Sequence, residues 1–249
     1  MDSQVVLEAR GLKKWFGALQ VINGVDLKVA RGAIHSIIGP NGAGKTTLFN
    51  LLTGFLKATH GEIIYRGKDI TGLPPFRIAK MGLARSFQIT SVFPELSVHE
   101  NVRVAAQATQ KHPYNFLLNY RSLKQASAKA DAVLASIGLY EQRDQLCKNL
   151  SYGDRRVLDI GISQATDPEV VLLDEPLAGL QAADHERIVG LIQDMAGSMT
   201  VVLIDHNIDI VTSISHVITV LNQGEVIAEG SPEEVKGNQK VQEAYLGGV

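Results

Sequence analysis

The sequence predicts an α/β fold with a mainly parallel central sheet, and three features of the chain indicate it. Two continuous apolar runs, residues 170–173 and 201–204, are each followed by an aspartate, as expected of buried parallel strands. A helical stretch at 184–196 can connect them in a βαβ crossover. A glycine-rich turn at 39–46 lies between a β-like run at 33–38 and a helical run. With 249 residues, 45% of them hydrophobic, the chain is long enough to bury such a core.

The two ends of the chain carry the other predicted strands. Runs rich in β-branched residues at 5–9 and 21–29 predict an N-terminal antiparallel β subdomain, and a run at 61–67 bounded by glycines predicts a further strand. A predicted hairpin at 217–228 turns at an Asn-Gln-Gly sequence. Residues 232–246 have a helical composition, so we expect the chain to end in a helix.

The middle of the chain differs from both ends in its composition and in the spacing of its apolar residues. Residues 98–110 and 122–137 carry alanine, glutamine and lysine with spaced apolar residues, which is a helical pattern. We therefore expect a helical subdomain at 89–150, inserted into a core formed by residues 1–88 and 151–249. The whole chain is then a single domain with two parts.

Composition narrows the possible partners. The net charge of −2 gives no reason to expect nucleic acid as a partner. Cys147 is the only cysteine, so it cannot form an internal disulfide, which fits a reducing compartment. Residues near the start lack the basic-then-apolar profile of a secretory signal, and the longest apolar runs have only the length of a strand. We therefore expect a cytoplasmic chain that reaches a membrane only through a partner.

The glycine-rich turn matches the phosphate-binding P-loop pattern. Its glycines allow the backbone to aim successive N–H groups at phosphate oxygens, and the following helix adds the positive end of its dipole. Lys45 can reach the β- and γ-phosphates, and Thr46 can place its hydroxyl on Mg²⁺. A chance glycine-rich turn is the alternative, and the strand before and helix after it argue against that. The predicted ATP-binding residues here are Gly39, Pro40, Asn41, Gly42, Ala43, Gly44, Lys45, Thr46 and Thr47.

Two carboxylates follow the apolar run at 170–173. Asp174 at the carboxyl end of this strand can hold Mg²⁺, directly or through water. Glu175 can then orient or deprotonate the water that attacks the γ-phosphate. Two adjacent acids can also form an ordinary solvated turn, but a buried strand in a chain with a P-loop favours the catalytic interpretation.

Residues 150–154, Leu-Ser-Tyr-Gly-Asp, precede a predicted helix and lie upstream of the acidic strand. Here the chain resembles the ATP-binding subunits of ABC transporters, whose Leu-Ser-Gly-Gly-Gln signature has the same place in the motif order. The resemblance implies a P-loop NTPase core and contacts from Ser151 and Gly153 to the γ-phosphate of nucleotide bound to the opposite subunit. The helix N-terminus makes such contacts physically sensible. By itself the pentapeptide would suit an ordinary serine N-cap equally well.

The resemblance assigns three further residues. Gln88 matches the glutamine that senses Mg²⁺ and the attacking water, and His206 matches the histidine that contacts the γ-phosphate. Phe16 matches the aromatic residue that stacks on adenine, a contact that needs only an aromatic face. Trp15 is the rival for this role, and Phe16 could also be a plain core aromatic.

Three residues depart from the family pattern. Tyr152 and Asp154 stand where glycine and glutamine are commonest, although Ser151 and Gly153 are kept. Gln181 stands where the loop after the acidic strand usually has aspartate, which places in doubt the usual contacts across a dimer at that position.

Several segments narrow the resemblance to the ATP-binding subunits of branched-chain (hydrophobic) amino acid importers, of the LivG type. These segments are residues 82–88, 93–102, 150–156, 222–235 and 244–248. Related subunits that serve urea, amides or other small solutes share the pattern, and no motif of the ATPase touches the solute. The resemblance implies membrane-embedded permease subunits and a second ATPase subunit, identical or paralogous, as partners. It also implies a solute-binding protein as an indirect partner, and a place on the inner face of the cell membrane.

Two other functions stay open at this point. A soluble ABC ATPase of DNA repair or the ribosome usually has two cassettes, long coiled-coil insertions or basic patches, and the sequence shows none of these. A regulatory subunit that binds nucleotide without hydrolysing it is the other alternative, and the retention of Lys45, Glu175 and His206 argues against it.

Overall fold

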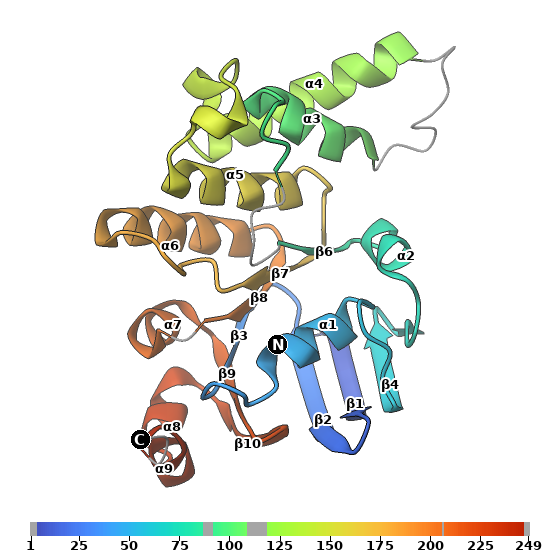
Figure 1. Cartoon of the computed structure of the whole chain (residues 1–249), viewed down its shortest axis with the longest axis vertical. Helices are drawn as coiled ribbons and strands as arrows, with labels where there is room; N and C mark the ends of the chain where they lie inside the picture. The colour runs from blue at the N-terminus through green and yellow to red at the C-terminus, as the bar shows by residue number, and fades with distance from the viewer. Residues whose placement is uncertain (1–3, 87–91, 109–118, 206, 247–249) are drawn as a thin grey trace.

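The computed structural model describes residues 4–86, 92–108, 119–205 and 207–246, and Figure 1 shows how they are layered. One half of the molecule holds the two β-sheets with the helix α1 (Lys45–Leu52) and the C-terminal helices, and stacked helices from the middle of the chain form the other half. In the described part of the chain, none of the helices combines the length and the apolar character needed to cross a bilayer.

The larger sheet has six strands in the order β10-β9-β3-β8-β7-β6. Strands β9, β3, β8, β7 and β6 run parallel, with Ile34 opposite Val201 and Val170 opposite Thr200, and β10 pairs antiparallel to β9. This arrangement confirms the predicted α/β class. The strands are β3 (Ile34–Ile38), β6 (Leu83–Arg85), β7 (Val170–Asp174), β8 (Thr200–Ile204), β9 (Val217–Asn222) and β10 (Glu225–Gly230).

The smaller sheet is antiparallel, with the order β2-β1-β4-β5. The long strand β1 (Val5–Phe16) extends well beyond the run at 5–9 that predicts it, because its pairing with β2 (Leu19–Ala30) continues to a turn at Gly17. The other two strands are β4 (His60–Tyr65) and β5 (Lys68–Asp69).

The strands β3, β7 and β8 are buried at every position, which explains the continuous apolar runs 170–173 in β7 and 201–204 in β8. Alternate side chains enter two different cores. Val171 and Leu173 pack with the stacked helices, whereas Val170 and Leu172 pack with α1 and the antiparallel sheet. Side chains therefore pack against β3 and β7 on both faces of the sheet.

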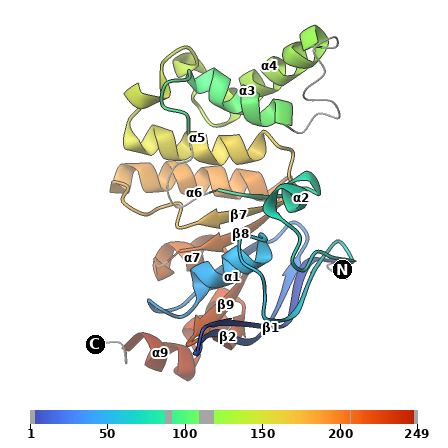
Figure 2. The same ribbon diagram turned by 45° about the vertical axis from the view of Figure 1, so that its right-hand side comes forward.

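The helices stack in layers above the larger sheet in both views (Figures 1 and 2). α6 (Ala182–Ala196) contacts β8 and α5 (Tyr152–Gln164) contacts β6 and β7, and the pair α3 (Val98–Ala108) and α4 (Asn119–Ser136) packs on α5 from beyond. α1 lies on the opposite face of the sheet. The short helix α7 (Ile208–Ile214) follows β8, and the 3₁₀ turns Tyr140–Gln142 and Cys147–Asn149 connect α4 to α5.

Two local predictions differ from the structure. The C-terminal helix is divided into α8 (Pro232–Lys236) and α9 (Gln239–Leu246), because α8 ends at Gly237, a residue that does not favour helix continuation. Helix α2 (Pro75–Lys80) and strand β6 were not predicted, since both are short and carry little periodicity.

Candidate nucleotide-binding site

The predicted P-loop connects β3 to α1 with a backbone that only glycine adopts easily. Gly39 has φ +154°, and a Cβ atom there would lie 2.0 Å from the carbonyl oxygen of Leu221. Gly44 caps α1 in a left-handed conformation, φ +101°, and a Cβ atom would lie 3.0 Å from the carbonyl oxygen of Val21. The loop therefore packs closely against neighbouring backbone, with the N-terminus of α1 directly behind it.

Lys45 is held inside this loop. Its side chain is buried, and its Nζ donates to the carbonyl oxygens of Gly39 at 2.7 Å and Pro40 at 3.0 Å. Burial lowers the pKa of the Lys45 ammonium from its usual value, and the nearby carboxylates of Glu175 and Asp174 oppose that shift. The charge is thus placed at the loop, where phosphate oxygens can replace the carbonyl partners.

A pocket of about 230 Å³ opens at the loop. It brings together the P-loop and Glu175, as predicted, and Thr46 is exposed in it. Its lining residues are Val21, Asn41, Gly42, Ala43, Gly44, Lys45, Thr46, Thr47 and Glu175.

Glu175 directly follows β7 in a conformation that is rare for a residue with a side chain, φ +46°. Its backbone N–H donates to the carbonyl oxygen of Ile204 at 2.8 Å, which fixes it at the carboxyl end of the parallel sheet. Such strained positions persist where the surroundings determine them, and they concentrate at functional sites. This geometry places the Glu175 carboxylate toward the Lys45 loop.

Asp174 lies one residue earlier and is almost fully buried. Burial raises the pKa of its carboxyl group above the ordinary value, and a bond from Arg85 at 2.8 Å opposes the rise. Arg85 also donates to the side-chain oxygen of Asn50 at 2.5 Å, so it connects β6 and β7 to α1. Sequence reasoning missed Arg85, and its closeness to Gln88 along the chain was the only local signal.

The oxygen donors at this site suit Mg²⁺. Thr46 offers an exposed hydroxyl in the pocket, and Asp174 offers a carboxylate that Arg85 orients. Among the described residues, no three or more histidine, cysteine or acidic side chains are arranged so that they could hold a metal ion together. Such a sparse set fits Mg²⁺, which usually keeps several waters and is bound by one or two protein groups together with substrate phosphates.

The signature residues lie elsewhere. Ser151 caps α5, accepting from the Asp154 N–H at 3.0 Å and donating to its carboxylate at 2.8 Å. Gly153 faces Asp184 so closely that a Cβ atom would lie 2.7 Å from its carboxylate. Neither residue is among the described residues that line the P-loop pocket, because α5 and α1 lie on opposite faces of the larger sheet (Figure 2).

The remaining predicted residues are placed as follows. Phe16 is exposed at the end of β1, with the Lys14 ammonium 5.0 Å from its ring centroid. Trp15, its rival, is half-buried and packs edge-to-face with His60, whereas Phe16 is exposed to solvent. Gln88 and His206 lie outside the described residues.

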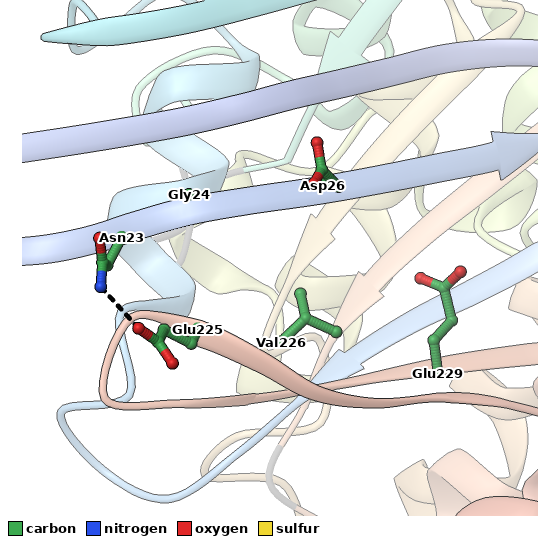
Figure 3. Close-up of a pocket in the computed structure, with 6 residues that line it drawn as sticks. All are labelled: Asn23, Gly24, Asp26, Glu225, Val226 and Glu229. Carbon is green, nitrogen blue, oxygen red and sulfur yellow. Dashed lines mark hydrogen bonds between the residues drawn. The ribbon is translucent and has the colours of Figure 1, made fainter.

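A second pocket of about 320 Å³ lies between β2 and β10 (Figure 3). Three carboxylates line it, from Asp26, Glu225 and Glu229, and Glu225 accepts a bond from Asn23 at 2.5 Å. Negative side chains disfavour a phosphate group. The P-loop pocket is therefore the better site for a nucleotide.

A phosphate loop between β3 and α1, beside an acidic end of β7, defines a P-loop nucleotide-binding protein. The added antiparallel sheet, the helical layer and the capped signature turn place it in the ATP-binding cassette class.

The chain belongs to the ABC transporter family of ATP-binding proteins. The family model described as "ABC transporter" matches residues 22–178, and the model described as "Branched-chain amino acid ATP-binding cassette transporter" matches residues 225–249. The predicted identity as an ABC transporter ATPase subunit is thereby confirmed.

Curated relatives match almost the full length. The high-affinity branched-chain amino acid transport ATP-binding protein LivG of Escherichia coli K12 is 41% identical, over 98% of this chain and 99% of the relative. BraF of Pseudomonas aeruginosa, with the same description, is 40% identical over the same shares. A crystal structure of an ABC transporter ATP-binding cassette in its ADP conformation superposes with a TM-score of 0.87 at 31% identity, covering 98% of this chain and 99% of that one.

Proposed function

We propose that this chain is the ATP-hydrolysing subunit of an importer for branched-chain amino acids, bound to the inner face of the cell membrane through permease subunits. The observation that carries the proposal is the pocket lined by both Lys45 and Glu175. It joins a phosphate cradle to a carboxylate suited to activate water, within a chain of the ABC transporter family.

Each residue of the pocket has a proposed role. The backbone N–H groups of Gly39 and of residues 41–47, together with the Lys45 ammonium, bind the phosphates of ATP, and Phe16 stacks on the adenine. Thr46 and Asp174, together with Gln88, would hold Mg²⁺, which neutralises phosphate charge when bound. Glu175 orients the attacking water and accepts its proton, and His206 contacts the γ-phosphate. Hydrolysis then removes the γ-phosphate contacts that hold the site closed.

A complete site requires a second subunit. Ser151 and Gly153 of one chain contact the nucleotide held by the P-loop of its partner, identical or paralogous, because the larger sheet separates the two motifs within one chain. The segment containing Gln88 and the helical subdomain at 89–150 transmit closure to the permease. A solute-binding protein takes part only through the permease, and nucleic acid has no role.

The proposed solute class rests on relatives rather than on a residue of this chain. LivG and BraF are described as branched-chain amino acid transport proteins, and the C-terminal segment 225–249 matches the family model that carries the same words. An ATPase subunit does not touch the solute, so fold and site alone give no substrate.

The test is transport by the complete complex. The chain is co-expressed with permease and solute-binding proteins of the same organism, and the complex is placed in proteoliposomes. Uptake of labelled leucine should require enclosed ATP and Mg²⁺ and should stop on Glu175→Gln. Uptake of urea but not leucine would overturn the solute class. ATP binding without any hydrolysis would favour a regulatory subunit.

A further inference from the structure

The signature helix α5 carries an arginine that is fully buried beside the catalytic loop. Arg156 is only 2% exposed, and its guanidinium donates to the backbone carbonyls of three consecutive residues. Its Nη2 bonds Asp174 O at 3.1 Å and also Glu175 O, and its Nε bonds Pro176 O at 3.1 Å. A buried guanidinium is costly unless its donors are satisfied, and these carbonyls satisfy several of them.

Tyr152 lies one helical turn before Arg156 on the same face of α5. Its hydroxyl donates to the carbonyl oxygen of Ala178 at 3.2 Å. Its ring covers Gly179, where a Cβ atom would lie 3.5 Å from the ring carbon Cε1 and where φ is +74°. Tyr152 and Arg156 together therefore bond the backbone carbonyls of residues 174, 175, 176 and 178. We call this pair of side chains the α5 clamp.

The signature turn is attached to the same stretch of chain. The Asp154 carboxylate accepts from Arg187 of α6 at 2.7 Å, and Gly153 packs against Asp184 at the start of that helix. Residues 174–187 are thus bonded to α5 near both ends. A shift of the signature turn relative to the sheet would act on this whole segment.

Glu175 needs such support. Its positive φ is unfavourable for a residue with a side chain, at a cost on the order of 1–3 kcal/mol, and neighbouring contacts must maintain it. The bonds from Arg156 to the carbonyl oxygens of Asp174, Glu175 and Pro176 restrict the backbone on both sides of Glu175.

We propose that Tyr152 and Arg156 are positioning residues that tie the Glu175 loop to the signature helix. Contact between the signature turn and the partner's nucleotide then sets the position of Glu175 in the same chain. The two ATP sites of a dimer are coupled through the α5 clamp. This inference rests on the proposed function, because it needs a dimer that hydrolyses ATP.

Two variants test the clamp. Tyr152→Phe removes one hydroxyl and keeps the ring over Gly179. Arg156→Lys keeps the charge, but a single ammonium cannot reproduce the planar set of donors. Tyr140→Phe, at an exposed tyrosine of the Tyr140–Gln142 turn, and Arg155→Lys, at the adjacent arginine of α5, are the matched controls.

The measurements separate positioning from simple stability. In the co-expressed complex, kcat for ATP should fall about 2- to 10-fold for Tyr152→Phe, the worth of one hydrogen bond, and more for Arg156→Lys, with KM unchanged. Both controls should stay within twofold of wild type. Hydrogen exchange of amides 175–180 in the isolated chain, measured well below the melting temperature, should accelerate in the clamp variants and not in the controls.

The outcomes are distinct. If the wild-type complex hydrolyses ATP and both clamp variants keep its kcat, the clamp has no positioning role. If the wild-type complex does not hydrolyse ATP, the proposed function fails, and unchanged exchange of amides 175–180 would then overturn the clamp as well. A lower melting temperature with unchanged kcat and exchange would leave only a packing role and also overturn it.

Discussion

The imidazole Nε2 of His35 lies 2.7 Å from the hydroxyl oxygen of Thr219, in the interior of the larger sheet. The Thr219 hydroxyl donates to the Glu229 carboxylate at 2.6 Å, so its oxygen accepts from His35 Nε2–H. Nδ1 of the ring is buried without a hydrogen-bond partner among the described residues. His35 is therefore neutral in the folded protein, and burial lowers the pKa of its imidazole to about 4.

This burial makes the folding stability depend on pH. The unfolded chain binds a proton at His35 below about pH 6.5, whereas the folded chain does so only near pH 4. The free energy of unfolding should therefore fall as the pH is lowered from 6.5 to 4, by on the order of 3 kcal/mol from this residue. Urea unfolding of His35→Gln should show a shallower loss over this range. An equal loss in both proteins would exclude His35 as the cause.

Replacing the catalytic carboxylate should separate binding from turnover. Glu175→Gln keeps the shape of the side chain but cannot accept the proton of the attacking water, so we expect kcat to fall about 10²- to 10⁴-fold. Calorimetry should show nearly unchanged affinity for ATP. Parallel loss of affinity and turnover would instead assign Glu175 to binding or structure.

Lys45 should act on binding itself. Lys45→Ala removes a charged donor from the loop, and a hydrogen bond to a charged group contributes about 1.5–3 kcal/mol, which corresponds to a loss of about 10- to 150-fold in ATP affinity. Titration of the isolated subunit with a fluorescent nucleotide measures this affinity. Circular dichroism checks that the variant folds. ATP affinity equal to wild type in a folded variant would contradict this role.

The sandwich of two subunits can be tested by cross-linking. Gly39 cannot accept a side chain, so the exposed Asn41 is the better cysteine position in the loop. In a Glu175→Gln background, Ser151→Cys with Asn41→Cys should give an inter-subunit disulfide that increases with ATP. Each single cysteine variant is the control. Because the natural partner can be a paralogue, the co-expressed complex is tested beside the isolated subunit. No ATP-dependent increase in either sample would favour a monomeric ATPase.

Local sequence could predict the elements whose pattern is itself local. The P-loop glycines directly indicate a tight turn, and the apolar runs that form β7 and β8 directly indicate buried strands. Strand β6 could not be predicted, because three residues carry no usable period and the strand exists only through pairing with β7.

The supporting contacts of the site could not be predicted at all. Arg85 meets Asp174 from 89 positions away, and Arg156 meets the carbonyls after β7 from 18 to 20 positions away. A backbone carbonyl as a partner leaves no trace in the residue types. Tyr152 also bonds a backbone carbonyl, and in the sequence it is visible only as a residue that stands where the family signature usually has glycine.

The separation of Ser151 from the Lys45 loop by the larger sheet has a consequence for how hydrolysis depends on subunit concentration. In the proposed two-subunit sandwich a lone chain holds two unlike half-sites and no whole one, so the hydrolysis rate of free subunits should rise with the square of their concentration until they are saturated with partner. A permease that carries two such subunits replaces this dependence with a fixed effective concentration, in the millimolar range for closely tethered groups. Assembly with the membrane subunits then acts as a switch against wasteful ATP consumption by chains that have no transporter to drive.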